Sequence, residues 1–393
     1  MPLSDVLHQE FAQKRLQRAL ASGRVPHAYL FSGPPGVGKE MLASRFAARL
    51  LCASPVEIPS LDGEMEVWTD ACGTCTVCTL FAAGNHPDFH RIYRRLNRFH
   101  PDRDVQRRKA LDLSVDVVRH FLIAEIGKRP SRGRAKVFVV IEAERMSIAA
   151  QNALLKTLEE PPGPSYLILL ASSPDAVLPT TRSRCQHVPF RGLPVDFVEA
   201  QILAKQGASP EAARFLAELC QGSLGLAERY VQAGVYDRVR PVLGAIQSAA
   251  RDPLGCGKGL AKLAEELGEA LEERHVVETV EEDVADDDEE EVLVDADANV
   301  VRQARLLVIA MTATILRDVQ RVAVGHEATA LPEEAAIREL AAGVDWRSIV
   351  AAIRAAGTAE YQIGRNAHTG LVFDSLGIAL GRALVRKPIA AGA

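Results

Sequence analysis

The run from Gly33 to Glu40, GPPGVGKE, constrains the fold of this chain more than any other part of the sequence. Gly33, Gly36 and Gly38 let backbone N–H groups turn toward phosphate oxygens, and Lys39 can reach the outer phosphates from the start of a following helix. An apolar run, HAYLFS, precedes the loop, and a helical pattern, MLASRFAARLLC, follows it. This order predicts a phosphate-binding P-loop in an α/β domain with a parallel sheet.

Two positions that should support magnesium carry unsuitable side chains. Glu40 replaces the Ser or Thr whose hydroxyl binds Mg²⁺, and it brings a negative charge toward an anionic ligand. In KVFVVIEAERMS, a strand that leads to the second acidic box, Ile141 stands where the metal-binding Asp is expected and Glu142 follows it. A register shifted by one makes Glu142 the metal acid but leaves Ala143 where an adjacent base is needed. Either interpretation predicts impaired hydrolysis.

Length and composition are those of a globular protein with two or three domains. The chain has 393 residues, of which 48% are hydrophobic and 25% are charged. No apolar stretch approaches the ~20 residues that span a membrane, and the first residues, MPLSDVLHQE, lack the pattern of a signal peptide. We therefore expect a cytoplasmic protein with no membrane partner.

Hydrophobic patterns divide the chain into three parts. Helical patterns alternate with apolar strands over the first part, and from Pro194 onward the patterns are helical. We place the strands at Ala28–Phe31, Val137–Ile141 and Tyr166–Ala171. We expect an α/β domain at 1–190, a small helical domain at 191–232 and a larger all-helical domain at 233–393.

Acidic residues are concentrated in one segment, Glu278–Asp297, which holds twelve acids and no base. Removing these twelve charges from the net charge of −5 leaves +7 for the rest of the chain. Such a segment repels itself and has few large apolar groups, so we expect a disordered insertion at about 276–298. A functional acidic segment that mimics nucleic acid is the alternative.

Four of the seven cysteines have the spacing of a zinc site. Cys52 ends the helix after the P-loop, and Cys72, Cys75 and Cys78 follow in DACGTCTVC. Four thiolates complete a tetrahedral Zn²⁺ site and leave no open position, so we expect a structural zinc module at about 52–78. A set of free thiols is the alternative.

A basic stretch, His90–Leu111, interleaves arginines with Tyr93 and Phe99. Arginines and aromatic rings suit phosphate contacts and base stacking in a nucleic-acid interface. The same composition suits a solvated surface loop, which is the interpretation we favour for a charge run.

The segment Gln151–Gln186, QNALLKTLEEPPGPSYLILLASSPDAVLPTTRSRCQ, resembles the clamp-loader branch of the AAA+ ATPases. Together with VPHAYLFSGPPGVGK and the four-cysteine insertion, it is similar to the bacterial DNA polymerase III clamp-loader family, which includes the tau/gamma and delta prime subunits. The resemblance covers roughly the first 230 residues closely and the helical tail loosely. It implies an AAA+ P-loop domain with a zinc insertion, then a small helical lid and an all-α collar domain.

The resemblance also assigns roles to particular residues. Residues 183–185 match the SRC motif, whose arginine reaches across an interface to the nucleotide of a neighbouring subunit. Arg184 would therefore act as an arginine finger in trans. Ser173 matches the first sensor position, while the second sensor region, Gly222–Tyr230, lacks its arginine.

These departures favour the delta prime kind, in which the chain's own ATP site is commonly degenerate while the SRC arginine is kept. The resemblance implies a subunit that works with tau/gamma and delta to load the sliding clamp on primed DNA, within the DNA polymerase III holoenzyme. We expect ATP or ADP to bind weakly or not at all at the P-loop, and no independent ATPase. One alternative is an active tau/gamma-like ATPase that uses Glu142 for magnesium. Another is a zinc-containing nucleic-acid-binding module with a vestigial P-loop.

Overall fold

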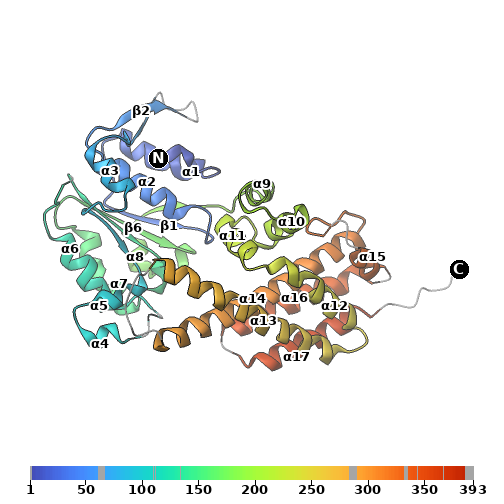
Figure 1. The fold of residues 1–393 in the computed structure, drawn as a ribbon. Helices are drawn as coiled ribbons and strands as arrows, with labels where there is room; N and C mark the ends of the chain where they lie inside the picture. The colour runs from blue at the N-terminus through green and yellow to red at the C-terminus, as the bar shows by residue number, and fades with distance from the viewer. Residues whose placement is uncertain are drawn as a thin grey trace. The chain divides into compact units, whose positions relative to one another are not determined.

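The structure is a computed structural model that describes residues 2–60, 67–108, 110, 112–132, 134–282, 290–331, 335–342, 344–365 and 367–385. The chain forms two compact units, Met1–Leu193 and Pro194–Ala393 (Figure 1). Among the residues described, no helix is both long and apolar enough to span a membrane.

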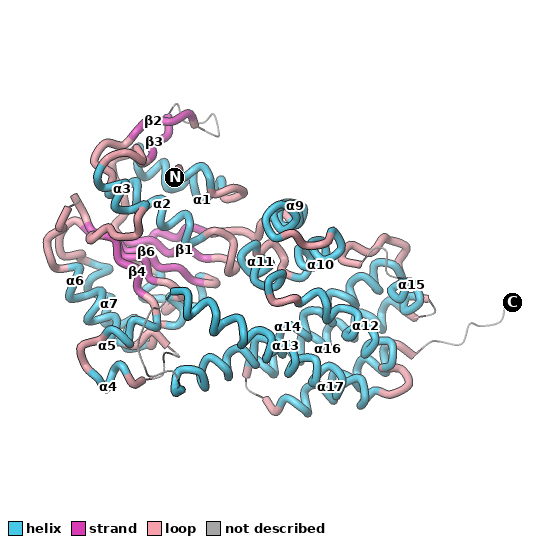
Figure 2. Tube along the Cα trace, viewed as in Figure 1, coloured by secondary structure: helices cyan, strands magenta, loops and turns pink. Residues whose placement is uncertain are grey.

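The centre of the first unit is a five-stranded sheet in the order β4-β5-β6-β1-β7, in which every neighbouring pair is parallel (Figure 2). Its strands are β1 (Ala28–Ser32), β4 (Phe89–Ile92), β5 (Lys136–Val140), β6 (Ser165–Ala171) and β7 (Gln186–Pro189). The three strands predicted from apolar runs are the three inner ones, so the α/β fold class is confirmed. The two strands that the prediction lacked, β4 and β7, lie at the edges of the sheet and are short and partly polar.

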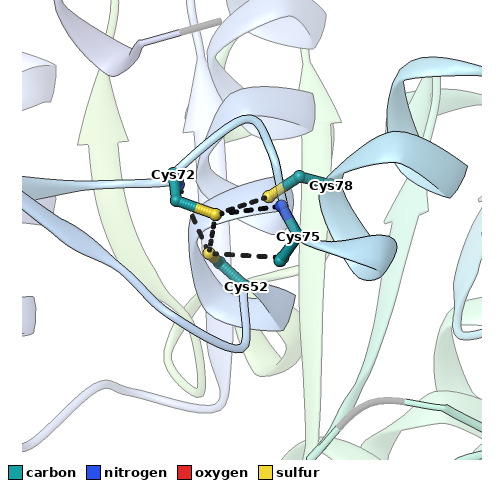
Figure 3. A group of neighbouring side chains, drawn as sticks. All are labelled: Cys52, Cys72, Cys75 and Cys78. Carbon is teal, nitrogen blue, oxygen red and sulfur yellow. Dashed lines mark hydrogen bonds between the residues drawn. The ribbon is translucent and has the colours of Figure 1, made fainter.

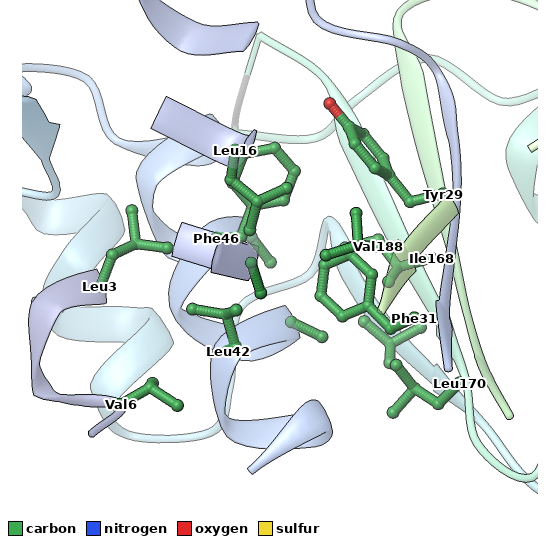
Figure 4. Close-up of a cluster of buried hydrophobic side chains, with 14 of the residues drawn as sticks. Leu3, Val6, Leu16, Tyr29, Phe31, Leu42, Phe46, Ile168, Leu170 and Val188 are labelled. Atoms are coloured by element: carbon green, nitrogen blue, oxygen red, sulfur yellow. The ribbon is translucent and has the colours of Figure 1, made fainter. Parts of the chain in front are cut away.

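Helices cover both faces of this sheet. Because successive strand residues point to opposite faces, Tyr29 and Phe31 pack toward one side with Phe46 (Figure 4). Leu30 packs toward the other side. The longer helices of the unit are α1 (Glu10–Ala21), α2 (Lys39–Leu51) and α7 (Ile148–Glu159). The shorter helices are η1 (Leu3–Asp5), α3 (Thr76–Ala82), η2 (Arg94–Phe99), α4 (Arg103–Gln106), α5 (Val115–Val117), η3 (Val118–Ile123), α6 (Ala124–Ile126), η4 (Ala143–Arg145), η5 (Pro174–Ala176) and α8 (Pro179–Arg182). Side chains of α1 and α2 belong to the first of these two cores, and those of α7 belong to the second.

An antiparallel pair of strands lies outside the main sheet, between α2 and β4 in the chain. It consists of β2 (Val56–Pro59) and β3 (Val67–Asp70), and α3 follows it. Trp68 on β3 is only 1% exposed, so the insertion is packed against the rest of the unit. Three of the four candidate zinc ligands lie in this insertion, at the end of β3 and on α3.

The second unit is entirely helical over its described residues. Its helices are α9 (Val195–Gln206), α10 (Pro210–Leu219), α11 (Leu224–Gln232), η6 (Val235–Arg238), α12 (Val239–Ser248), α13 (Pro253–Glu282), α14 (Glu290–Ala323), α15 (Ala335–Ala341), α16 (Trp346–Gly364) and α17 (Thr369–Ala383). The first three pack on one another, as expected for the small helical domain. They lie in the same compact unit as the later helices. The sequence analysis divided this region into two domains near residue 232.

The longer helices of the second unit form its main packed group. Helix α13 packs against α14 and α17, and α16 also packs against both of these. A Cβ atom at Gly377 would clash with the carbonyl oxygen of Pro253, so glycine allows the backbones of α13 and α17 to approach closely.

The acidic segment falls partly outside the described residues. We predicted a disordered insertion at about 276–298, but the structure continues α13 to Glu282 and begins α14 at Glu290. Helices α13 and α14 therefore reach into the two ends of the predicted insertion. The central residues, 283–289, lie outside the part that the structure describes.

Candidate functional site

The P-loop joins β1 to α2 at the carboxyl edge of the sheet. Gly33, Gly36 and Gly38 all have positive φ angles, of 154°, 68° and 95°. A Cβ atom at Gly33 would clash with the carbonyl oxygen of Phe190, so only glycine fits there. The glycine positions predicted from the sequence therefore form the backbone cradle that a phosphate group requires.

Lys39, the first residue of α2, is folded back onto its own loop. Its Nζ donates hydrogen bonds to the carbonyl oxygens of Gly33 and Pro34, at 2.5 and 2.6 Å. Burial lowers the pKa of Lys39 to about 8, and the nearby Glu144 carboxylate opposes this shift. A phosphate group would have to replace these carbonyl oxygens as the hydrogen-bond partner of Lys39.

Glu40 is held by an arginine from the basic stretch. Nη2 of Arg91, on β4, lies 2.5 Å from Oε1 of Glu40. In a P-loop ATPase the residue at position 40 supplies a hydroxyl to Mg²⁺. In this chain the positive charge beside position 40 is the guanidinium of Arg91.

Glu142, just beyond the end of β5, is held in the same way. Nε of Arg94 donates to Oε2 of Glu142 at 2.7 Å, and Nη1 of Arg94 donates to the carbonyl oxygen of Ala110 at 3.0 Å. Glu142 has a left-handed backbone, with φ 53° and ψ 52°, which is uncommon for a residue other than glycine. The carboxylate that could have bound magnesium is thus already paired.

Two further residues complete this edge of the sheet. Ile141 packs against the core that includes Phe31, so it offers no ligand for a metal ion. Oε1 of Glu144 accepts the backbone N–H of Ser172 at 3.2 Å. Ser173, the predicted sensor, follows Ser172 and begins η5, and its carbonyl oxygen accepts the N–H of Ala176. The residues present fit a phosphate cradle but do not fit a magnesium site.

Arg184 follows α8 by two residues and contacts the end of α7. Its Nε donates to Oε1 of Glu159 at 2.7 Å, and its Nη2 donates to the same oxygen. Its Nη1 donates to the carbonyl oxygen of Thr180 at 2.9 Å. The side chain remains 34% exposed, so the predicted finger can be reached from outside the unit.

The four predicted zinc ligands come together from α2, the end of β3 and α3 (Figure 3). Their sulfur atoms all lie within 4.8 Å of one another. Cys52 Sγ lies 3.6 Å from Cys72 Sγ and 4.0 Å from Cys75 Sγ, and Cys72 Sγ lies 3.9 Å from Cys78 Sγ. A tetrahedral ion with Zn–S bonds of about 2.3 Å requires S–S distances of about 3.8 Å.

Backbone N–H groups support the same cluster. The N–H of Cys72 donates to Cys52 Sγ, and that of Cys75 donates to Cys72 Sγ, both at 3.3 Å. Hydrogen bonds from the backbone of Thr74 and Cys75 lower the pKa of the Cys72 thiol to about 6, whereas burial raises the pKa of Cys78 to about 12. Such donors stabilise sulfur ligands as thiolates, so the donor set fits Zn²⁺.

The zinc cluster is connected to the P-loop through the N-terminal segment. Oδ2 of Asp70, two residues before Cys72, accepts the N–H of Leu3 at 2.6 Å. Val6, three residues after Leu3, lies against the P-loop. A Cβ atom at Gly38 would be only 3.1 Å from Cγ1 of Val6. The N-terminal segment therefore contacts both the insertion, through Leu3, and the P-loop, through Val6.

The preferred interpretation of the basic stretch is wrong for its first half. Residues 90–99 form most of β4 and all of η2 rather than a solvated loop, and Ile92 and Asn97 are buried. Two of its arginines face the acids of the P-loop edge, as described above. A third, Arg108, pairs with Asp116 at 2.7 Å.

Sequence reasoning missed four residues of these sites: Arg91, Arg94, Glu144 and Glu159. A usable signal existed for the two arginines, because they stand at or just beyond the carboxyl end of the short edge strand β4, where ligands of parallel sheets bind. A signal also existed for Glu159, an acid in the last turn of a helix just before two prolines.

A P-loop at the carboxyl edge of a parallel sheet, with an SRC arginine in the same unit, defines a P-loop domain of the AAA+ class. Residues 8–194 match the family described as "DNA polymerase III, delta subunit". The first part of the chain is therefore similar to DNA polymerase III clamp-loader subunits, the family that its motifs resemble.

The similarity extends to individual proteins. The chain is 37% identical over 205 residues to DNA polymerase III subunit delta' of Pseudomonas aeruginosa, and 30% identical over 212 residues to that of Bacillus subtilis. These alignments cover 48% and 54% of this chain and 55% and 56% of the relatives, so the chain matches about half the length of each. It is 32% identical over 226 residues, 56% of this chain, to 31% of subunit tau of Escherichia coli. A gamma subunit-related protein of Thermotoga maritima aligns over 96% of this chain and 99% of its own length, but with 13% identity and a TM-score of 0.38.

Proposed function

We propose that this chain is a delta-prime-like subunit of the DNA polymerase III clamp loader. It assembles with tau/gamma and delta subunits and helps to place the sliding clamp on primed DNA. Its own P-loop does not hydrolyse ATP, and its Arg184 acts on the nucleotide of a neighbour. The cysteine cluster holds a structural Zn²⁺.

The observation that carries this proposal is the contrast between the two ends of the phosphoryl-transfer machinery. The groups that would hold magnesium at the chain's own P-loop are Glu40 and Glu142, and both are already paired with arginines. The SRC arginine, Arg184, is bonded to Glu159 and to the carbonyl oxygen of Thr180, and its side chain is 34% exposed, so a neighbour's phosphate can reach it. A subunit of this kind contributes to hydrolysis only at a neighbour's site.

A guanidinium supplied in trans stabilises the charge that spreads over the transferred phosphoryl group. Arginine fingers of this kind raise the rate of related reactions by roughly 10³ to 10⁵. Arg184 suits this role because its planar guanidinium can contact two phosphate oxygens at once. A local ion pair with no function is the alternative, since exposed arginines often pair in this way.

The test is the ATPase of a complex reconstituted from this chain with its tau/gamma and delta subunits. Arg184→Ala should assemble normally and depress the clamp- and DNA-stimulated ATPase, because the neighbouring site that it serves loses roughly 10³-fold or more in rate. Arg184→Lys should recover little, since a lysine cannot reproduce bidentate contact.

Arg182→Ala is the matched control. Arg182 lies two residues earlier on the same turn and also forms an ion pair, with Asp175. The Arg182→Ala substitution should leave the ATPase of the complex unchanged. Full ATPase and clamp-loading rates in an Arg184→Ala complex of normal composition would reject the proposed function.

The alternative of a zinc-containing nucleic-acid-binding module receives less support. It relies on the basic stretch, yet Arg91, Arg94 and Arg108 are paired with carboxylates of the same unit. Strong DNA binding by the chain without any partner subunit would favour this alternative.

A further inference from the structure

Glu159 and Arg184 form a contact that organises the whole guanidinium. Nε and Nη2 of Arg184 both donate to Oε1 of Glu159. Nη1 donates to the carbonyl oxygen of Thr180 and, at 3.4 Å, to Oγ of Ser183. All three guanidinium nitrogens therefore have partners within their own chain.

The stability of α7 does not explain the acid at position 159. Glu159 is the last residue of α7, where the negative end of the helix dipole disfavours a carboxylate. The helix ends there because Glu160 precedes a proline and leaves the helical region, with φ −136° and ψ 88°. The positive charge of Arg184 offsets the unfavourable interaction between the Glu159 carboxylate and the dipole of its own helix.

The pair is accessible to a competing anion. The side chain of Arg184 is 34% exposed and that of Glu159 is 49% exposed. Exposed ion pairs are weak, and breaking one changes an equilibrium by roughly two- to fivefold. A phosphate group of a neighbouring subunit can therefore replace the carboxylate without disrupting the fold.

We propose that Glu159 is a positioning residue for the arginine finger, an inference that rests on the proposed function. In the free subunit Glu159 holds the guanidinium of Arg184 at the end of α8. When the interface with a neighbour closes in the assembled complex, Glu159 releases the guanidinium to the phosphate of the neighbour's nucleotide. While the pair persists, the carboxylate cancels the charge that the finger brings to the phosphate, so Glu159 restrains hydrolysis until the interface closes.

The first arm of the test uses the isolated full chain and a dicarbonyl reagent that modifies arginines. The rate of modification at Arg184 is followed by mass spectrometry of the peptides. Glu159→Gln should raise this rate by about two- to fivefold, because the amide no longer pairs with the cation. Asp175→Asn is the matched control, which should raise the rate at Arg182 but not at Arg184.

The second arm uses the reconstituted complex without clamp or DNA. Glu159→Gln should raise kcat for ATP by about two- to fivefold with little change in KM, because the finger acts on the transition state. In an Arg184→Ala background the same change should have no effect, since Glu159 acts only through Arg184. A merely structural role for Glu159 would not produce this dependence, and Asp175→Asn should leave the rate unchanged.

Each arm can overturn the inference. Equal modification rates at Arg184 in wild type and Glu159→Gln would overturn it, whatever the function of the chain. An unchanged or lower kcat in the Glu159→Gln complex would do so too, as would an equal effect with and without Arg184. A normal ATPase in the Arg184→Ala complex is a separate result, which rejects the finger and with it this role of Glu159.

Discussion

Arg94 Nε lies 2.7 Å from Glu142 Oε2 and joins the segment after β4 to the segment after β5. The Arg91–Glu40 pair makes a second such connection, between β4 and the first turn of α2. In a P-loop ATPase a magnesium ion links the corresponding parts of the loop and the strand end. In this chain the two ion pairs instead connect each of these parts to β4 or to the segment that follows it.

We expect no appreciable ATP hydrolysis by the isolated chain. Glu40 removes the hydroxyl ligand, and Ile141 is an apolar side chain in the place of an acid, so magnesium cannot be positioned. A phosphate-release assay with Mg²⁺ should give the same rate for wild type and Lys39→Ala. Robust hydrolysis that Lys39→Ala abolishes would mean that the chain is an active ATPase of the tau/gamma kind.

Removing the acid of the P-loop should strengthen nucleotide binding. Glu40→Ala frees the guanidinium of Arg91 and removes a negative charge near the phosphates, so ADP should bind roughly fivefold more tightly by calorimetry without added Mg²⁺. Arg91→Ala should weaken binding by a similar factor because Glu40 is left unpaired. Arg107→Ala, an exposed residue of the same basic stretch, serves as the control and should change nothing. Weaker binding by Glu40→Ala would contradict this role of the ion pair.

We expect one zinc ion per chain, held by the four-cysteine cluster. Cys78→Ser should lose the metal and lower the free energy of unfolding of the first unit by more than about 2 kcal/mol, since metal binding contributes to folding. Elemental analysis and the fluorescence of Trp68, with Trp346 replaced by Phe, measure the two effects. Cys256→Ser, a buried cysteine of the second unit, should keep the zinc. Freshly purified protein that lacks zinc and titrates all four thiols would disprove the site.

The first unit should lose stability as the pH falls below about 6.5. Burial lowers the pKa values of His86 and His90 below the ordinary value of 6.5, so both rings are neutral when folded. Between that value and their lowered values, the unfolded chain binds protons that the folded chain does not, and acid therefore favours unfolding. Urea unfolding followed by Trp68 in the Trp346→Phe protein should give a smaller free energy at pH 5.5 than at pH 7.5.

Replacing both histidines is the control for this pH dependence. His86→Asn together with His90→Gln removes the groups that titrate and should reduce the difference between the two pH values. An equal difference in the double variant would assign the effect to other groups.

Local patterns predicted the parts of the molecule that depend on neighbouring residues. Strands β1 and β6 are buried runs, so their apolar sequences identified them, and the spacing of four cysteines predicted that they would cluster. The ion pairs could not be predicted in this way. Arg91 and Glu40 are 51 residues apart, and Arg94 and Glu142 are 48 apart. They meet only because β4 lies beside β5, a strand order that periodicity does not reveal.

The arrangement around Glu142 limits how a magnesium site could be built into this chain. An Asp at position 141 alone would place a carboxylate where Ile141 now packs against the core, and a Ser at position 40 alone would leave Arg91 without its acid. Glu142 also has a left-handed backbone and forms an ion pair with Arg94, and both features would have to change at the end of β5. Each single substitution therefore loses an existing contact and does not by itself complete a metal site.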